Sequence, residues 1–368
     1  MTKPSLTHLA LADLTLIIPS LDRAAFLRRQ IAYWQQYPIT ILIVEGASVN
    51  NETDTKIGEA RVIHIKSPLS VTQRLLLACE RISTEYVAYC SDEDLYLPKG
   101  LMSSITRLKT EPHLVGCLGA AIRFSRRGSY LFAQTINSDN KDSSSVSRSA
   151  SRRVLDNFRG KKISNQMFGV YRSHDWISVS RTCFREMYST AYVYEFLWSL
   201  LMLYRGEVGV HHDLTWLSSA ENPSIMTGAS FNRKLDVVEW MTESRYAYEV
   251  QKMQQLAVQS LTGLGAEPLE VVESTVSHYC LSFKGRYQHK RTWKYKWRPR
   301  QLSLRLLPLV PHPVKIFVKR RVPARFTGTL GLGIVPLQEL HKELARRNVV
   351  RDEDEWNHFC EIVALPPL

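Results

Sequence analysis

Three consecutive acidic residues, Asp92, Glu93 and Asp94, are the sharpest chemical feature of the sequence. They follow the short apolar run Tyr86 to Cys90, with only Ser91 in between. Carboxylates this close repel one another, and a hard divalent cation that also contacts phosphate oxygens is the simplest compensation. The run therefore predicts a metal site. A solvated acidic turn is the alternative interpretation, because the chain has a second acidic run at residues 352–355.

A further carboxylate stands out because of its apolar surroundings. Glu195 lies near the start of the apolar helical stretch Tyr192 to Tyr204. Burial raises the pKa of an isolated carboxyl group, which suits a general base. An acidic residue stabilised by the positive end of a helix is the alternative. Asp175 is the second candidate for the base.

These residues need a scaffold, and the first 125 residues predict one. Short apolar runs alternate with helical patterns, an order typical of an α/β protein with a parallel sheet. The segments expected as strands or helices are residues 14–18, 26–34, 39–44, 62–65, 71–82 and 86–90. Polar loops leave the first strand at Pro19 and the second at Glu45, at the edge of a sheet where ligands bind.

Four short motifs occur in order within about residues 13–220: a strand that ends in the turn Pro19 to Arg23, a strand that ends at Glu45, a helix that carries Arg74, and the acidic run Asp92 to Asp94 with Pro98 after it. Together they resemble the family-2-like glycosyltransferases of GT-A fold. Residues 14–23 resemble the family's opening strand and proline-containing turn, with Pro19 and Arg23 in this turn and Asp22 where Asn is usual. The segment that contains Glu45 resembles the second strand, and Glu45 stands where an acidic residue normally reads the nucleobase.

Two further motifs support the resemblance. Arg74 resembles the arginine on a helix that helps to hold the nucleotide. Asp92 to Asp94, followed by Pro98, resemble the DxD metal motif and its trailing proline. All the motifs occur in the order and at the spacing that the family has.

The resemblance implies a GT-A type nucleotide-diphospho-sugar transferase with a Rossmann-like, mixed sheet. It implies a nucleotide-sugar donor, with UDP favoured, and a Mn or Mg ion held by Asp92, Asp94 and His212. Inversion at the sugar is expected, with Glu195 as the base. Because the sequence lacks a Gln-x-x-Arg-Trp motif, we expect one sugar per acceptor rather than processive polymerisation. The residues expected to bind the donor are Pro19, Asp22, Arg23, Glu45, Arg74, Asp92 and Glu93.

The net charge of the 368 residues, +13, is concentrated in one block. Residues 274–337 contain 14 Lys or Arg and no Asp or Glu, so the rest of the chain is close to neutral. Tyr287, Trp293, Tyr295 and Trp297 lie among these cations, a mixture that suits an anionic membrane surface. Single-stranded nucleic acid stacked on the aromatic rings and a merely solvated basic face are the alternatives.

Composition restricts the class of protein. Hydrophobic residues make up 44% and charged residues 23%, which is ordinary for a globular chain and excludes collagen-like and disordered proteins. The 6 cysteines occur singly, which argues against a zinc site or a disulfide framework and favours a reducing cytosol. No segment has 18 consecutive apolar residues, so we expect a peripheral rather than a membrane-spanning protein.

We therefore expect two regions. Residues 13–235 are predicted to form the glycosyltransferase domain, and residues 236–368 a mainly helical, basic appendage that contacts a membrane or the acceptor. The serine-rich residues 138–152 predict a loop, either a surface insertion or a lid over the substrate. The expected activity is sugar transfer to a lipid-linked or cell-surface polysaccharide acceptor at the cytoplasmic face of a membrane. A nucleic-acid-binding protein or nucleotidyltransferase that uses the basic block is the alternative.

Overall fold

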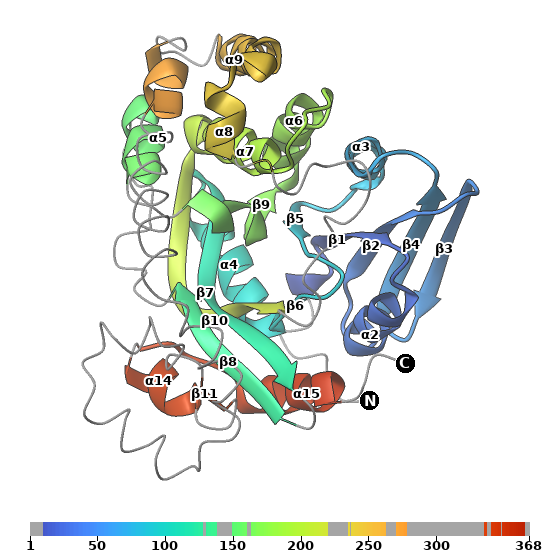
Figure 1. The fold of residues 1–368 in the computed structure, drawn as a ribbon. Coiled ribbons are helices and arrows are strands. Elements are labelled where there is room, and N and C mark those ends of the chain that lie inside the picture. Colours follow the sequence, from blue (N-terminus) through green and yellow to red (C-terminus); the bar gives the residue numbers. More distant parts are fainter. Residues whose placement is uncertain are drawn as a thin grey trace.

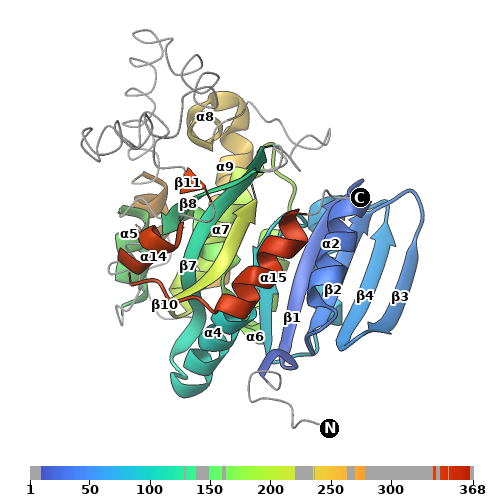
Figure 2. The same cartoon turned by 90° about the horizontal axis from the view of Figure 1, so that it is seen from below.

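The computed structural model describes residues 10–127, 130–137, 149–159, 163–219, 235, 237–262, 270–277, 335–336, 340–346 and 348–364. In this part of the chain, 11 strands form one mixed sheet, and helices cover both of its faces (Figures 1 and 2). The α/β fold class predicted from the sequence is confirmed. Most of the basic block, residues 278–334 and 337, and most of the serine-rich segment, residues 138–148, lie outside the described residues.

The first half of the sheet contains the parallel strands expected from the apolar runs. They are β1 (Leu14–Leu21), β2 (Thr40–Gly46), β4 (Ala60–Ser67) and β5 (Tyr86–Tyr89), with β3 (Asn51–Ile57) antiparallel at the edge. Strand β1 lies between β2 and β5 and is parallel to both. The chain passes from β1 to β2 and β4 on one side and returns to β5 on the other. The strand order therefore reverses between β1 and β5.

Helices α2 (Ala24–Trp34) and α3 (Val71–Arg81) pack on opposite faces of these strands. Successive residues of β1 alternate between the two apolar layers: Leu16 packs with α2, and Ile17 with α3. Since both faces are covered, the strands are continuous apolar runs rather than alternating ones. A capping box at Ser70, reciprocal with Gln73, fixes where α3 begins.

The second half of the sheet is built around two long strands. The remaining strands are β6 (Leu95–Tyr96), β7 (Leu114–Arg127), β8 (Tyr130–Asn137), β9 (Val170–Arg172), β10 (Glu207–Ser219) and β11 (Val335–Pro336). Strand β10 runs parallel to β7 and antiparallel to β6. The sequence predicts a strand only over residues 207–210. The structure extends it to Ser219 through register shifts between Val210 and Trp216, where polar residues interrupt the apolar pattern.

Helices also complete the second half. They are α4 (Pro98–Thr110), α5 (Ala150–Arg159), the 3₁₀ helix η2 (Ile163–Phe168), α6 (Ser173–Cys183), α7 (Tyr192–Arg205), α8 (Val237–Thr242), the 3₁₀ helix η4 (Ser244–Tyr246), α9 (Ala247–Leu261), α14 (Leu340–Arg346) and α15 (Glu353–Ala364). Helix α7 is almost wholly buried, as its apolar sequence predicts. Helix α15 packs on α2 on the other face of the sheet (Figure 2). The rings of His358 and Tyr33 stack there with centroids 5.1 Å apart.

The C-terminal helix also contacts the start of α4. Both carboxylate oxygens of Glu355 accept the backbone N–H of Lys99, at 2.9 and 3.0 Å, so a residue of α15 caps α4. Helices α14 and α15 come from the region predicted as an appendage, yet they pack on the sheet. The ring of Phe359 in α15 lies 5.2 Å from that of Phe124 in β7, and α14 contacts β8. None of the described helices is both long and apolar enough to cross a bilayer.

Candidate functional site

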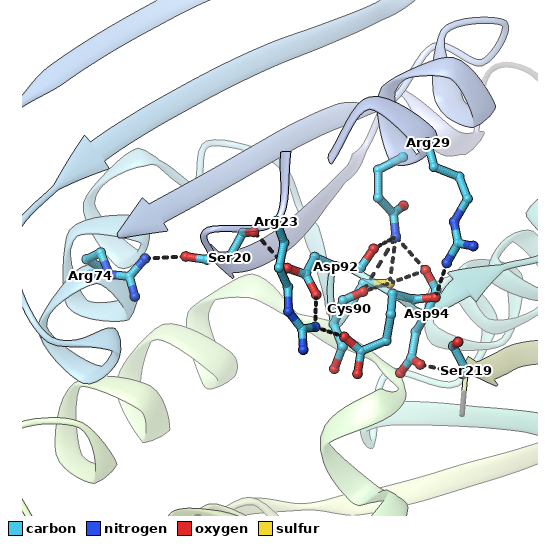
Figure 3. Close-up of polar contacts among 11 residues, drawn as sticks. Ser20, Arg23, Arg29, Arg74, Cys90, Asp92, Asp94 and Ser219 are labelled. Carbon is cyan, nitrogen blue, oxygen red and sulfur yellow. Dashed lines mark hydrogen bonds and ion pairs between the residues drawn. The ribbon is translucent and has the colours of Figure 1, made fainter. Parts of the chain in front are cut away.

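The loop of residues 90–94, which follows β5, is shaped by two buried side chains of α2. Gln30 Nε2 donates a hydrogen bond to the backbone carbonyl of Asp92 at 3.0 Å. Arg29 Nη2 donates to the backbone carbonyl of Glu93 at 2.7 Å (Figure 3). Because both donors project from one rigid helix, α2 fixes the direction in which the acidic side chains leave the loop.

The fully buried Asp92 joins this loop to the end of β1. Its Oδ2 accepts a hydrogen bond from Ser20 Oγ at 2.7 Å, and its Oδ1 accepts one from Arg23 Nη1 at 2.8 Å (Figure 3). The same Nη1 of Arg23 also pairs with Glu93 Oε2. The loops that follow β1 and β5 are therefore held together at the point where the strand order reverses.

Asp94 joins the same loop to the end of β10. Its Oδ1 accepts the backbone N–H of Ser219 at 2.7 Å, and its Oδ2 accepts Trp216 Nε1 at 3.0 Å. Burial raises the pKa of Asp94 to about 7, although these two hydrogen bonds oppose the increase. Burial, followed by a hydrogen bond with Asp92, raises the pKa of Glu93 to about 8. The acidic run predicted from the sequence is thus a largely desolvated cluster rather than a solvated turn.

Glu195, in the first turn of α7, and the carboxylates of the acidic loop all act electrostatically on Tyr89. Burial, followed by the negative charges of Glu195, Asp92 and Asp94, raises the pKa of Tyr89. Burial raises the pKa of Glu195 itself to about 7. The half-buried carboxyl makes no hydrogen bond or ion pair with any other described residue. Glu195 therefore has the raised pKa that the sequence predicts.

Arg74 joins the carboxyl ends of two neighbouring strands. Its Nη1 donates to the carbonyl of Ser20 at 2.6 Å (Figure 3). It also donates to the carbonyl of Val44 at 2.8 Å. Burial lowers the pKa of this guanidinium. Through these two backbone carbonyls, Arg74 holds the ends of β1 and β2 together and so helps to position the loop after β1.

Glu45, at the end of β2, is paired with side chains of the next strand. Its Oε2 lies 2.8 Å from Nε2 of His64 and 3.6 Å from Nζ of Lys66. The side chain is mostly buried, with 14% exposed. These contacts hold the Glu45 side chain against β4, while its backbone lies opposite Ser20 of β1. They do not test whether Glu45 reads a nucleobase.

Pro19 and Asp22 lie at the end of β1, as predicted. Pro19 is buried opposite Val44 of β2. Asp22 has a φ of 54°, in the left-handed region that Asn and Asp occupy more readily than most other residues. This conformation gives a physical reason for an Asp at the position where the sequence comparison expects Asn.

Two predicted site residues lie away from the cluster. Asp175 accepts a hydrogen bond from Arg205 Nε at 2.9 Å, and Arg205 ends α7, ten residues and about 15 Å along the helix from Glu195. His212 is exposed on β10, four residues before Trp216, which is roughly 13 Å along a strand. The structure brings neither side chain to the acidic loop.

The side chains of the cluster test whether a metal ion fits. Among the described residues, no three His, Cys, Asp or Glu side chains converge as ligands of a metal ion. All four carboxylate oxygens of Asp92 and Asp94 accept hydrogen bonds from protein groups. The guanidinium of Arg23 pairs with both Asp92 and Glu93, where a cation would bind. In this arrangement the donor set does not fit the Mn or Mg ion expected from the sequence.

Several residues of the site carry no recognisable motif. Ser20 and Gln30 are ordinary polar residues in the sequence, and Trp216 lies in the apolar stretch of β10. The ring of Trp216 stacks on Phe168, with centroids 4.1 Å apart, and Phe168 meets the edge of Tyr89 at 5.7 Å. These aromatic rings form one side of the site. The only signal in the sequence is the position of Ser20, directly after Pro19 of the predicted turn.

No family model and no curated protein matches this sequence. Among solved structures, the chain is similar to S. aureus TarS 1–349, with a TM-score of 0.46 and 12% identity over 95% of this chain and 89% of that one. The same protein in complex with UDP gives a TM-score of 0.45 and 11% identity over 95% and 89%. The complex with UDP-GlcNAc gives 0.42 and 11% over 75% and 92%. At this level of similarity we transfer no residue role to this chain. The fold class is assigned from the strand order and the helices described above.

Proposed function

We propose that this protein is a glycosyltransferase that moves a sugar from a nucleotide-sugar donor to an acceptor hydroxyl. The observation that carries the proposal is the meeting of two loops where the strand order of the sheet reverses. Ser20 and Arg23 follow β1, and both donate hydrogen bonds to Asp92, which follows β5. Open α/β sheets bind nucleotide ligands in the crevice at such a point.

Glu195 is the proposed general base. Its carboxyl has a pKa of about 7 because of burial, and its charge acts on Tyr89 together with those of Asp92 and Asp94. A carboxylate with a pKa near the working pH accepts the proton of an acceptor hydroxyl as its oxygen attacks the anomeric carbon. The nucleoside diphosphate leaves from the opposite face of the sugar, so the configuration is inverted.

The donor and acceptor are proposed from the sequence. A UDP-sugar is favoured because residues 13–220 resemble family-2-like glycosyltransferases. The acceptor would be lipid-linked or a cell-surface polysaccharide, reached from the cytoplasmic face of a membrane. The 14 Lys or Arg of residues 274–337 support this part of the proposal, since each contributes about 1 kcal/mol near an anionic lipid surface.

The proposal is tested by the binding of nucleotide-sugars to the full chain. We expect one of a panel of UDP-, GDP- and CMP-sugars to raise the melting temperature, with assays run both in Mn²⁺ and in EDTA. Asp94→Ala should abolish turnover of that donor, because it removes the contacts that join the acidic loop to β10. The matched control Asp354→Ala removes an exposed carboxylate of the second acidic run and should leave turnover unchanged.

The competing function predicts a different result. A nucleic-acid-binding protein would bind single-stranded oligonucleotides at submicromolar concentration, with an affinity that falls log-linearly with salt concentration. If oligonucleotides bind in this way and no nucleotide-sugar stabilises the protein in either buffer, the glycosyltransferase proposal is wrong.

A further inference from the structure

We propose that Arg23 is a built-in cation that binds the diphosphate of the donor, so that donor binding does not require a divalent metal ion. The inference rests on the proposed function, because it concerns how the same site neutralises a nucleotide-sugar. It replaces the Mn or Mg ion expected from the sequence with a residue of this chain.

The first observation is the place of Arg23 among the carboxylates. Only 9% of the residue is exposed, and Nη1 is held by Asp92 Oδ1 at 2.8 Å and by Glu93 Oε2. Ser20 Oγ occupies the other oxygen of Asp92. A divalent cation bound to these oxygens would compete with the guanidinium for the same acceptors. The carboxylates therefore position Arg23 in the role that a metal ion would otherwise have.

The second observation is an unused donor on the same side chain. Nη2 of Arg23 is buried and has no hydrogen-bond partner among the described residues. A guanidinium carries five N–H donors in a planar fork, and a buried charged donor without a partner is costly. An anionic oxygen is the partner that it lacks. Figure 3 shows the guanidinium of Arg23 next to the side chain of Asp92, to which Ser20 also donates a hydrogen bond.

The local backbone favours the same class of ligand. Arg23 is the N-cap of α2, and the first turn of this 11-residue helix contains no acidic residue. The positive end of the helix dipole therefore adds to the charge of the guanidinium on the loop after β1. A diphosphate, with two adjacent anionic groups, suits a fork-shaped cation beside a helix N-terminus better than a single carboxylate would.

The test is isothermal titration of UDP, with GDP as a second probe, into the metal-stripped full chain. Wild type should bind the nucleotide in EDTA with an affinity within about 3-fold of that in Mn²⁺ or Mg²⁺. Arg23→Gln in EDTA should bind it about 10-fold to 100-fold more weakly, the range for loss of a charged hydrogen bond. Arg28→Gln changes an exposed arginine of the same helix and should bind as wild type does.

A second readout separates this role from a merely structural one. In Arg23→Gln, Asp92 and Glu93 lose their cation, so Mn²⁺ should now restore nucleotide binding that EDTA removes again. Circular dichroism and the melting temperature will check that the variant is folded. The comparison of wild-type binding in EDTA with binding in Mn²⁺ or Mg²⁺ does not depend on any variant.

The outcomes separate the two proposals. If wild type binds UDP or GDP only when Mn²⁺ or Mg²⁺ is present, the role of Arg23 is wrong and the glycosyltransferase proposal stands. If Arg23→Gln binds as well as wild type in EDTA, the inference is also wrong. If wild type binds neither nucleotide under any condition, both proposals are wrong.

Discussion

Replacement of Glu195 by Gln tests the catalytic base and the desolvation of its carboxyl in one variant. The pKa of Glu195 is about 7, against 4.5 in an unperturbed glutamate. At 1.36 kcal/mol for each pH unit between these values, keeping the carboxylate ionised lowers the free energy of unfolding by about 3 kcal/mol. Because the side chain is partly exposed, this figure is an upper limit.

The sign of the pH dependence follows from the direction of this pKa change. Below pH 4.5 the carboxyl is protonated in both the folded and the unfolded chain, and ionisation costs nothing. As the pH rises from 4.5 to 7, the unfolded chain ionises first, and stability is lost across this window. The glutamine side chain of Glu195→Gln cannot ionise, so the variant should not lose this stability. The raised pKa values of Glu93 and Asp94 affect both proteins and cancel in the difference.

The assay combines urea unfolding at pH 5 and pH 8 with initial rates of sugar transfer between pH 5.5 and 9. We expect Glu195→Gln to become more stable relative to wild type at pH 8 than at pH 5, by at most about 3 kcal/mol. The wild-type rate should rise through pH 7, and the variant should be slower by about 10²-fold to 10⁴-fold without this rise. The control Glu59→Gln changes an exposed side chain and should do neither.

Two results would refute this reasoning. A variant with the wild-type rate would show that Glu195 is not the base, and Asp175 would be the next candidate. An unchanged difference in stability between pH 5 and pH 8 would show that the carboxyl is not desolvated in the folded protein.

Two single substitutions test the scaffold, and a variant with four reversed charges tests the basic block. Arg74→Met removes the donor to the carbonyls at the ends of β1 and β2 and should lower the free energy of unfolding by about 3 kcal/mol in urea, whereas the surface variant Arg81→Met should change it by less than about 1 kcal/mol. Gly100→Ala should lower the free energy of unfolding by about 1–3 kcal/mol in the same assay. The added Cβ would lie 2.6 Å from the carbonyl oxygen of Leu214 and 2.7 Å from Cα of Thr215. Charge reversal in the basic block should release the protein from anionic vesicles in a sedimentation assay and leave donor hydrolysis nearly unchanged. If the reversed protein still pellets with the vesicles, the membrane-docking proposal is wrong. The four positions for reversal are Lys294, Lys296, Arg298 and Arg300.

The parallel strands could be predicted because their burial is visible in the sequence. Strands covered on both faces need apolar residues at almost every position, so β1 and β2 appear as continuous runs. The carboxyl ends of such strands share one edge of the sheet, which placed Asp92 near the loop after β1. The raised pKa of Glu195 could be predicted because an apolar helix such as α7 is buried, and a single carboxylate within it is therefore desolvated.

The partners of the acidic side chains could not be predicted. Ser20 lies 72 residues from Asp92, and Trp216 lies 122 residues from Asp94. No local pattern connects positions this far apart without an alignment or a structure. Strand β10 was predicted to end at Val210 because its polar middle breaks the apolar pattern, although the register shifts let it continue to Ser219. The two donors to Asp94, Trp216 and Ser219, therefore lie in a segment that the sequence did not assign to the sheet.

This distribution of contacts decides which experiment can identify the cation of the site. Asp92 joins the loops after β1 and β5, and Asp94 joins the second of these to β10. Loss of activity in Asp92→Ala or in Asp94→Ala is thus expected whether the carboxylates bind a metal ion or position Arg23. Chelation leaves every one of these contacts in place and changes only the supply of metal. Nucleotide binding that persists in EDTA and becomes dependent on Mn²⁺ in Arg23→Gln would therefore assign the cation to Arg23 itself.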